Sequence, residues 1–300
     1  MKSLKEIKTD LEVLHDFHDI IETYEEIAAI RMRKVKMSVL MEREFLKGLG
    51  DVFRFVEMAY DTYLIKLGNL KKGKRHFLKT NNKDARVLLS ANMGLYGEIV
   101  HKTVNKFMDD AKQDSSQLVV IGKVGKRIME SLMPEKEFQY FDFSDAGIDD
   151  DNIKRILDYV LQYRNIYVYH GLFDTILNQK VAVTNVTGDI SKFAGAEEGK
   201  EEKQEVENPK FGFFEPTIED VAAFFETQTL SVIFEQAVHE SSLSKFASRM
   251  VTLDMAVLNV NDQIKKTNFN YKKMKHRNFN KKQIVLLSSI FAMRSKENGR

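Results

Sequence analysis

The sequence contains no cysteine and only 3 prolines among its 300 residues. The absence of cysteine excludes disulfide scaffolds, thiolate metal sites and cysteine nucleophiles, and it fits a reducing compartment. Because helix interiors exclude proline, its scarcity favours long uninterrupted helices. Apolar runs are also short, and none approaches the roughly 20 residues that a membrane-spanning helix needs.

Net charge is low although charged residues are abundant. Charged residues make up 30% and hydrophobic residues 43% of the chain, and the formal net charge is +2. This balance indicates a soluble protein with a sizeable core, and it argues against nucleic-acid binding as the main role. The N-terminal segment MKSLKEIKTD lacks the apolar core of a signal peptide. We therefore expect a cytoplasmic protein that reaches a membrane only through a partner.

The N-terminal third repeats apolar residues at alternating spacings of three and four. Only His18, Glu25 and Glu42 interrupt this stripe, which predicts one helix of roughly 95 Å that pairs with another helix in a left-handed coiled coil. We assign residues 1–70 to it. The stripe consists of Leu4, Ile7, Leu11, Leu14, His18, Ile21, Glu25, Ala28, Met32, Val35, Val39, Glu42, Leu46, Leu49, Phe53, Val56, Tyr60, Tyr63 and Leu67.

The same spacing returns near the other end of the chain. Phe246, Met250, Leu253, Val257, Val260 and Ile264 follow it, and no proline occurs between Ile218 and Met293. Residues 211–300 are therefore predicted to form a second coiled-coil helix, antiparallel to the first. The residues chosen to represent the seam between the two helices are Leu11, Leu14, Met32, Val35, Met250, Leu253, Val257 and Ile264.

Between the two helices the hydrophobic period changes. Short apolar runs at 85–90, 117–122, 165–170 and 180–184 predict strands, and helical patterns at 96–113, 124–133 and 151–163 separate the first three. Strands that alternate with helices indicate a small, mostly parallel α/β domain, Rossmann-like, over residues 80–210. A charged segment at 195–209 is predicted to be a solvated loop. The expected fold class is thus α/β or α+β, with a long antiparallel coiled coil.

Six short motifs occur in an order that is similar to one known family. They are AAIRMRK at 28–34, SANMGLYGEI at 90–99, IGKVG at 121–125, FEP at 214–216, ESSLS at 240–244 and ASRMV at 247–251. Together with the helix–α/β–helix order, these motifs resemble those of the gamma subunit of F-type ATP synthases. The resemblance covers nearly the whole chain.

The resemblance implies a central rotor shaft and not an enzyme. Such a shaft couples ATP hydrolysis or synthesis in a surrounding hexamer of alpha- and beta-type subunits to rotation and ion translocation. ATP and magnesium would be bound by those partners, and this chain would bind no cofactor. The α/β domain would contact an epsilon-type subunit and a membrane rotor ring, which places the complex at the inner face of the cell membrane.

The same resemblance implies three groups of contact residues. The expected hexamer contacts are Arg31, Arg33, Lys34, Lys275, His276, Arg277 and Asn280. The expected tip of the shaft comprises Gln283, Ile284, Leu286, Leu287, Ile290 and Phe291. The ring contact would involve Phe214 and Glu215.

Departures from the family pattern leave alternatives open. Lys275 stands where the family has arginine, His276 replaces a glutamine, and Glu22 lies where a lysine is usual. These changes allow a gamma-like shaft whose output is not ion pumping, such as a gliding or motility motor with other output machinery. A coiled-coil adaptor or a nucleic-acid-binding protein is the alternative from another class, because basic residues alternate with aromatic ones over 265–282.

No catalytic or metal site is predicted. His15 and His18 lie one helical turn apart, but no third ligand has suitable spacing, and His18 is better explained as a polar interruption of the seam. The segment Gly122–Arg127 has too few residues between its glycines for a phosphate loop, so we interpret it as a strand-to-helix turn.

Overall fold

The computed structural model describes residues 3–66, 80–113, 115–143, 145, 150–187, 215 and 217–297. The chain forms two compact units. We call residues 1–27 with 250–300 the shaft unit, and residues 28–249 the foot unit. Within the described residues, no helix has both the length and the apolarity to cross a membrane. The segment boundaries 1–70, 80–210 and 211–300 stay a prediction.

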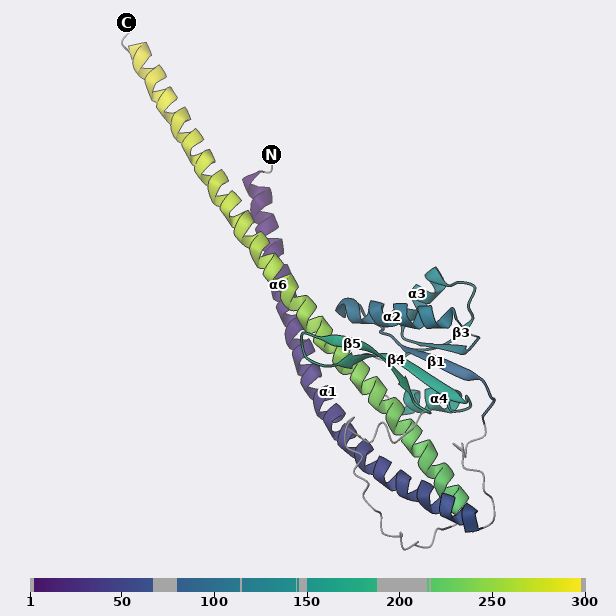
Figure 1. Cartoon of the computed structure of the whole chain (residues 1–300). Coiled ribbons are helices and arrows are strands. Elements are labelled where there is room, and N and C mark those ends of the chain that lie inside the picture. The colour runs from purple at the N-terminus through teal and green to yellow at the C-terminus, as the bar shows by residue number, and fades with distance from the viewer. Residues whose placement is uncertain are drawn as a thin grey trace. The chain divides into compact units, whose positions relative to one another are not determined.

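Two very long helices confirm the prediction from the 3–4 spacing (Figure 1). Helix α1 spans Leu4–Lys66 with 63 residues, and helix α6 spans Ile218–Glu297 with 80 residues. At 1.5 Å per residue they measure about 95 Å and about 120 Å. Helix α1 begins at a capping box, because the Ser3 backbone N–H donates to Glu6 Oε2 at 2.7 Å and the Glu6 N–H donates to Ser3 Oγ at 3.2 Å. Helix α6 begins after Thr217, whose Oγ1 accepts the Asp220 N–H at 3.1 Å.

The shaft unit pairs the first part of α1 with the last part of α6 in an antiparallel arrangement. Leu4 lines one groove together with Phe279, whereas Ile7, one turn further along α1, lines another with Met274. Residue numbers on α6 thus fall as those on α1 rise. Helix α1 begins at Leu4, and α6 continues past the residues that line these two grooves to Glu297 (Figure 1).

The foot unit contains a five-stranded sheet in the order β3-β2-β1-β4-β5. Strands β1 (Asp84–Leu89), β2 (Gln117–Ile121), β3 (Phe138–Phe141) and β4 (Asn165–Phe173) are parallel, and β5 (Gln179–Asn185) pairs with β4 in the antiparallel sense. The connecting helices are α2 (Gly97–Ala111), α3 (Lys123–Leu132) and α4 (Asp150–Val160). The mostly parallel α/β domain is therefore confirmed.

Strand β3 is the element that the sequence analysis missed. It has four residues and lies at the edge of the sheet, with Leu118 of β2 opposite Phe138. Its alternation is too short to stand out against the polar residues before it, and its pairing with β2 is what makes it a strand.

Both faces of the sheet are covered. Val87, Val119 and Val168 belong to a core that also includes residues of α4 and α6, among them Ile156 and Phe234. On the opposite face, Phe107 of α2 meets Tyr169 edge-on, with ring centroids 5.3 Å apart. Burial of both faces explains why the strand segments are nearly continuous apolar runs instead of alternating ones.

Candidate functional site

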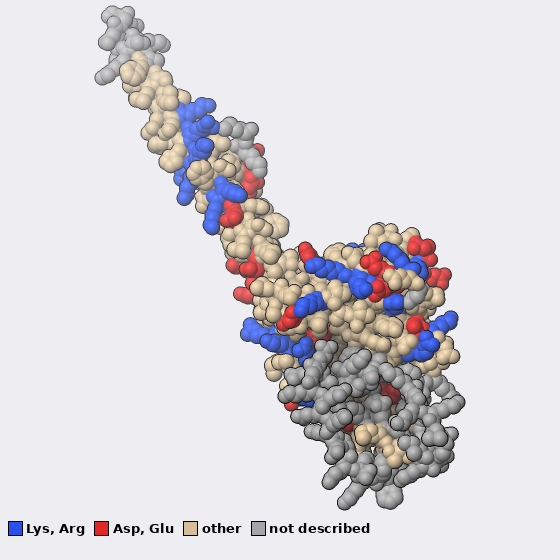
Figure 2. All heavy atoms as spheres, in the orientation of Figure 1, with Lys and Arg blue, Asp and Glu red and all other residues tan. Residues whose placement is uncertain are grey.

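The distal part of α6 is strongly basic. Figure 2 shows lysine and arginine side chains gathered along this stretch of the shaft unit. The predicted hexamer contacts Lys275, His276, Arg277 and Asn280 are all exposed there. Further exposed cations on the same stretch are Lys265, Lys266, Lys272, Lys273, Lys281 and Lys282. The stretch therefore presents a positive surface to any partner around it.

The tip of α6 is apolar on every side. Six large apolar side chains between Ile284 and Phe291 are exposed, and Leu286 and Leu287 among them expose 62% and 56% of their surface; Ser288 and Ser289 are the polar residues of this segment. Successive helical residues are about 100° apart, so the consecutive residues 284–287 alone point in all directions around the axis. A helix that is apolar all round normally lies in an apolar environment. The predicted tip residues Gln283, Ile284, Leu286, Leu287, Ile290 and Phe291 all belong to this exposed segment.

The three predicted contacts on α1 have different environments, and they belong to the foot unit. Arg33 and Lys34 are exposed, whereas Arg31 is half-buried. Burial and the nearby Asp145 raise the pKa of Tyr96, and the positive charges of Arg249 and Arg31 oppose that rise. Arg31 thus lies close to a buried tyrosine, and Arg33 and Lys34 face solvent.

The other predicted site residues are placed as follows. Glu215 is exposed, and Phe214 and the loop 195–209 lie outside the described residues. Among the eight residues chosen for the seam, Met32 and Leu253 are buried and the others are half-buried, namely Leu11, Leu14, Val35, Met250, Val257 and Ile264.

A buried ion pair joins α6 to the sheet within the foot unit. The Lys245 ammonium donates to the backbone carbonyl of Ser90 at 3.0 Å and to Asp145 Oδ1 at 3.3 Å. The side chains of Lys245 and Asp145 expose only 9% and 3% of their surface. Burial lowers the pKa of Lys245, and the charge of Asp145 opposes that shift. The carboxylate is further satisfied by the backbone N–H groups of Asn92 and Met93, at 2.7 and 2.8 Å.

Arg249, one turn further along α6, binds the loop that follows β1. Its Nη2 donates to the Gly94 carbonyl at 2.7 Å, and its guanidinium lies 4.0 Å from the centre of the Tyr96 ring. Asn92 extends the network, since its Oδ1 accepts the Lys123 N–H at 2.8 Å and its Nδ2 donates to Asp142 Oδ1 at 2.7 Å. We call Lys245, Arg249, Asp145 and the loop 90–96 the junction.

Glycines permit the close approach of these segments. Gly122 has a φ of +100°, and a Cβ there would lie 2.9 Å from the backbone nitrogen and oxygen of Ala91. A Cβ on Gly171 of β4 would lie 2.6 Å from Ser244 Oγ of α6. The motifs at 90–99 and 121–125 therefore meet residues 240–249 of α6 in one place within the foot unit. The sequence indicates these motifs but no role for Lys245 or Asp145, because the pairing of these two residues depends on the fold.

Two further polar pairs link α1 and α6 within the foot unit. Glu42, one of the interruptions in the apolar stripe, pairs with His239, and Arg43 pairs with Glu240. The Glu240 side chain exposes only 3% of its surface. Polar pairs in an apolar seam penalise any other alignment of the helices, so these contacts favour a single register.

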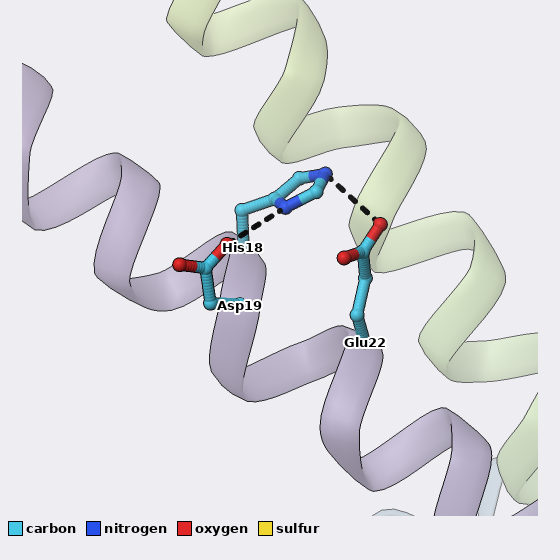
Figure 3. Close-up of side chains that lie close together, drawn as sticks. All are labelled: His18, Asp19 and Glu22. Carbon is cyan, nitrogen blue, oxygen red and sulfur yellow. Dashed lines mark hydrogen bonds and ion pairs between the residues drawn. The ribbon is translucent and has the colours of Figure 1, made fainter.

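His18 also has polar neighbours (Figure 3). Its Nδ1 lies 3.4 Å from Asp19 Oδ1 and its Nε2 lies 3.5 Å from Glu22 Oε1. All three side chains belong to one stretch of α1, and the two carboxylates are exposed. Each ring nitrogen of the half-buried imidazole thus has a carboxylate oxygen beside it. The prediction that the chain holds no metal stays a prediction.

These features define a class of protein. Two long helices, a small α/β domain that grips one of them, and a helix tip that needs a surrounding partner are typical of a stalk subunit in a larger assembly. A family model described as ATP synthase matches residues 3–279. The chain belongs to the gamma-subunit family of ATP synthases, and as such it is a central-stalk subunit of a rotary ATPase.

Relatives with similar sequences support this assignment. The ATP synthase gamma chain of Malacoplasma penetrans is 24% identical over 91% of this chain and 94% of its own length. The ATP synthase gamma chain of Protochlamydia amoebophila is 20% identical over 96% of this chain and 98% of its own.

Solved structures share the fold. A chain of the Euglena gracilis mitochondrial ATP synthase (OSCP/F1/c-ring, rotational state 3) matches 98% of this chain and 95% of its own length, with a TM-score of 0.62 at 12% identity. A chain from the central stalk and c-ring of the Tetrahymena thermophila mitochondrial ATP synthase matches 79% of this chain and 99% of its own, with a TM-score of 0.58 at 17% identity. The comparisons favour neither a motor without ion pumping nor an adaptor or nucleic-acid-binding protein.

Proposed function

We propose that this chain is the rotating shaft at the centre of a hexamer of alpha- and beta-type ATPase subunits. The apolar tip of α6 carries this proposal, because the consecutive apolar side chains of residues 284–287 are exposed and point in all directions around a single helix. A ring of subunits can enclose such a tip, whereas a single flat partner would leave half of it in water.

The shaft couples chemistry to rotation through differential contact. An asymmetric shaft presses differently on each catalytic subunit, and nucleotide affinity changes only where contacts differ between states. By reciprocity, nucleotide occupancy drives the angle of the shaft. The exposed cations Lys275 and Arg277 supply contacts of this kind to acidic surfaces of the hexamer.

In this proposal the chain catalyses nothing and holds no cofactor. ATP and magnesium are bound by the alpha- and beta-type subunits. The foot unit joins the shaft to an epsilon-type subunit and to the membrane rotor ring, so the assembly lies on the cytoplasmic side of the membrane. The junction supports this role, because a buried ion pair and a stacked arginine hold α6 against the sheet and resist slippage under torque.

Purification of the tagged chain from its native cells tests the proposal. We expect recovery of an ATPase-active complex that contains alpha- and beta-type subunits, and the remaining subunits will identify what the shaft turns. Recovery of the chain without any ATPase subunit would refute the proposal.

A tip variant tests the observation that carries the proposal. Leu286→Glu combined with Leu287→Glu places charge in the enclosed segment, and we expect severalfold less hexamer to co-purify. Met255→Glu is the matched control, because Met255 lies on the same helix, exposes 59% of its surface and is outside the tip. Equal loss of hexamer in both variants would show that the tip has no special role.

A further inference from the structure

Helix α1 carries a second apolar stripe beside the one that faces α6. It consists of Val13, Phe17, Ile20, Tyr24 and Ile27, which expose between 40% and 56% of their surface. Each of these residues precedes a residue of the first stripe by one position, and one position turns a helix by about 100°. The second stripe therefore lies on a flank of α1 that α6 leaves exposed. It belongs entirely to the shaft unit.

An acidic edge borders this second stripe. Glu12, Asp16, Asp19 and Glu26 each precede a residue of the stripe by one position, and all four are exposed. They form a row about 100° further round the helix, on the side away from α6. We call the apolar stripe and its acidic row together the acidic-edged stripe.

The spacing and the charge describe the partner that this surface fits. Apolar residues three and four apart over four turns match the apolar face of another α-helix. The acidic row favours lysine or arginine along one edge of that helix, because opposite charges across a contact stabilise it and like charges oppose it. We propose that the acidic-edged stripe binds a basic amphipathic helix of a partner subunit.

A second copy of this chain fits the surface poorly. In a symmetric antiparallel pair of helices, like edges face each other, so the acidic row of one copy would oppose the acidic row of the other. The negative edge also disfavours binding to anionic lipid surfaces. A basic helix satisfies both the apolar stripe and the charged row.

This inference goes beyond the proposed function, because the stripe is separate in sequence from the tip of α6 and from the basic stretch at 265–282. The partner helix adds a third helix alongside the coiled coil of the shaft unit. Its chemistry, an apolar face with a lysine- or arginine-rich edge, identifies it in any subunit that co-purifies.

Photo-crosslinking in the complex purified from native cells tests the inference. Benzoylphenylalanine replaces Ile20 in the stripe or, as a control, Glu22, which is exposed and lies two positions further round α1. We expect Ile20 to crosslink to a partner segment with apolar residues three and four apart and a net positive charge, and Glu22 to crosslink to that segment at least fivefold less. Mass spectrometry identifies the crosslinked peptide.

Three results would overturn the inference. The first is a crosslink from position 20 to a second copy of this chain. The second is a crosslink to a segment that is neutral or acidic, or whose apolar residues lack helical spacing. The third is no crosslink from position 20 while a probe at Leu287 in the tip crosslinks efficiently. Recovery of the hexamer is scored in the same preparations, so failure of the stripe and failure of the proposed shaft role are distinguished.

Charge reversal supplies a second measurement that leaves the apolar core intact. Asp16→Lys combined with Glu26→Lys should lower the crosslink yield at Ile20 by about tenfold, because two attractive pairs become repulsive ones. Asp254→Lys combined with Asp262→Lys, two exposed acids of α6 in the same unit, should leave the yield unchanged. An unchanged yield in the first variant would contradict the role of the acidic row.

Discussion

Replacement of Lys245 by methionine should destabilise the foot unit through the charge that it leaves behind. Methionine keeps most of the length of the side chain but removes the ammonium group that contacts Asp145 at 3.3 Å and the Ser90 carbonyl at 3.0 Å. Asp145 exposes 3% of its side chain, so water cannot replace the lost partner. Removal of one member of a buried pair costs about 3–5 kcal/mol. The backbone N–H groups that still reach Asp145 should keep the loss near the lower end of that range.

The aspartate supplies the internal control. Asp145→Asn removes the charge but keeps an oxygen that accepts the N–H groups of Asn92 and Met93. If the unpaired carboxylate causes the damage, Lys245→Met with Asp145→Asn should be more stable than Lys245→Met alone by about 1–3 kcal/mol. Urea unfolding followed by tyrosine fluorescence measures all four proteins of the cycle, since the chain has no tryptophan.

Two results would refute this reasoning. The first is a loss below about 1 kcal/mol for Lys245→Met, which would place the pair in the range of exposed salt bridges. The second is additive behaviour of the two substitutions, which would show that the ammonium and the carboxylate do not interact.

Three other predictions concern the foot unit and the long helices. Burial lowers the pKa of His170 from 6.5 to about 4. Its contribution to stability is therefore complete above pH 6.5, and about 3 kcal/mol is lost as the pH falls from there through 4. In His170→Gln, the free energy of unfolding should depend less on pH over that window. Gly122→Ala should cost about 2 kcal/mol or more, because the φ of Gly122 is +100° and a Cβ there would contact the backbone of Ala91. Gly48→Ala should instead stabilise α1 by about 0.5–1 kcal/mol, because the space around a Cβ at Gly48 is open. Thermal melts measure both changes. Tyr169→Phe should cost about 1–3 kcal/mol in urea unfolding, because the buried hydroxyl donates to Asp110 Oδ2 at 2.9 Å; no change would contradict the contact.

The long helices could be predicted from the sequence because helical periodicity is a local property. Apolar residues three and four apart from Leu4 onward, together with the lack of proline, determine the helix and its length. The same reasoning located four of the five strands, since both faces of β1, β2 and β4 are buried and their apolar runs are nearly continuous.

Strand β3 and the junction could not be predicted in this way. The four residues of β3 have a weak local preference and become a strand because β2 offers them hydrogen bonds. Lys245 and Asp145 are 100 residues apart, and neither sits in a local pattern that implies a buried charge. Only the packing of α6 against the carboxyl ends of the strands brings them together and removes water from both.

The acidic-edged stripe shows most clearly what the sequence determines and what only the tertiary structure decides. The sequence by itself determines that Val13, Phe17 and Ile20 lie on one flank of a helix with acids beside them, because about 100° per residue follows from backbone geometry alone. Two apolar flanks on one helix leave open which of them faces α6. That choice belongs to tertiary structure, because burial depends on which surfaces the packed helices remove from water, and the packing with α6 leaves these three side chains exposed.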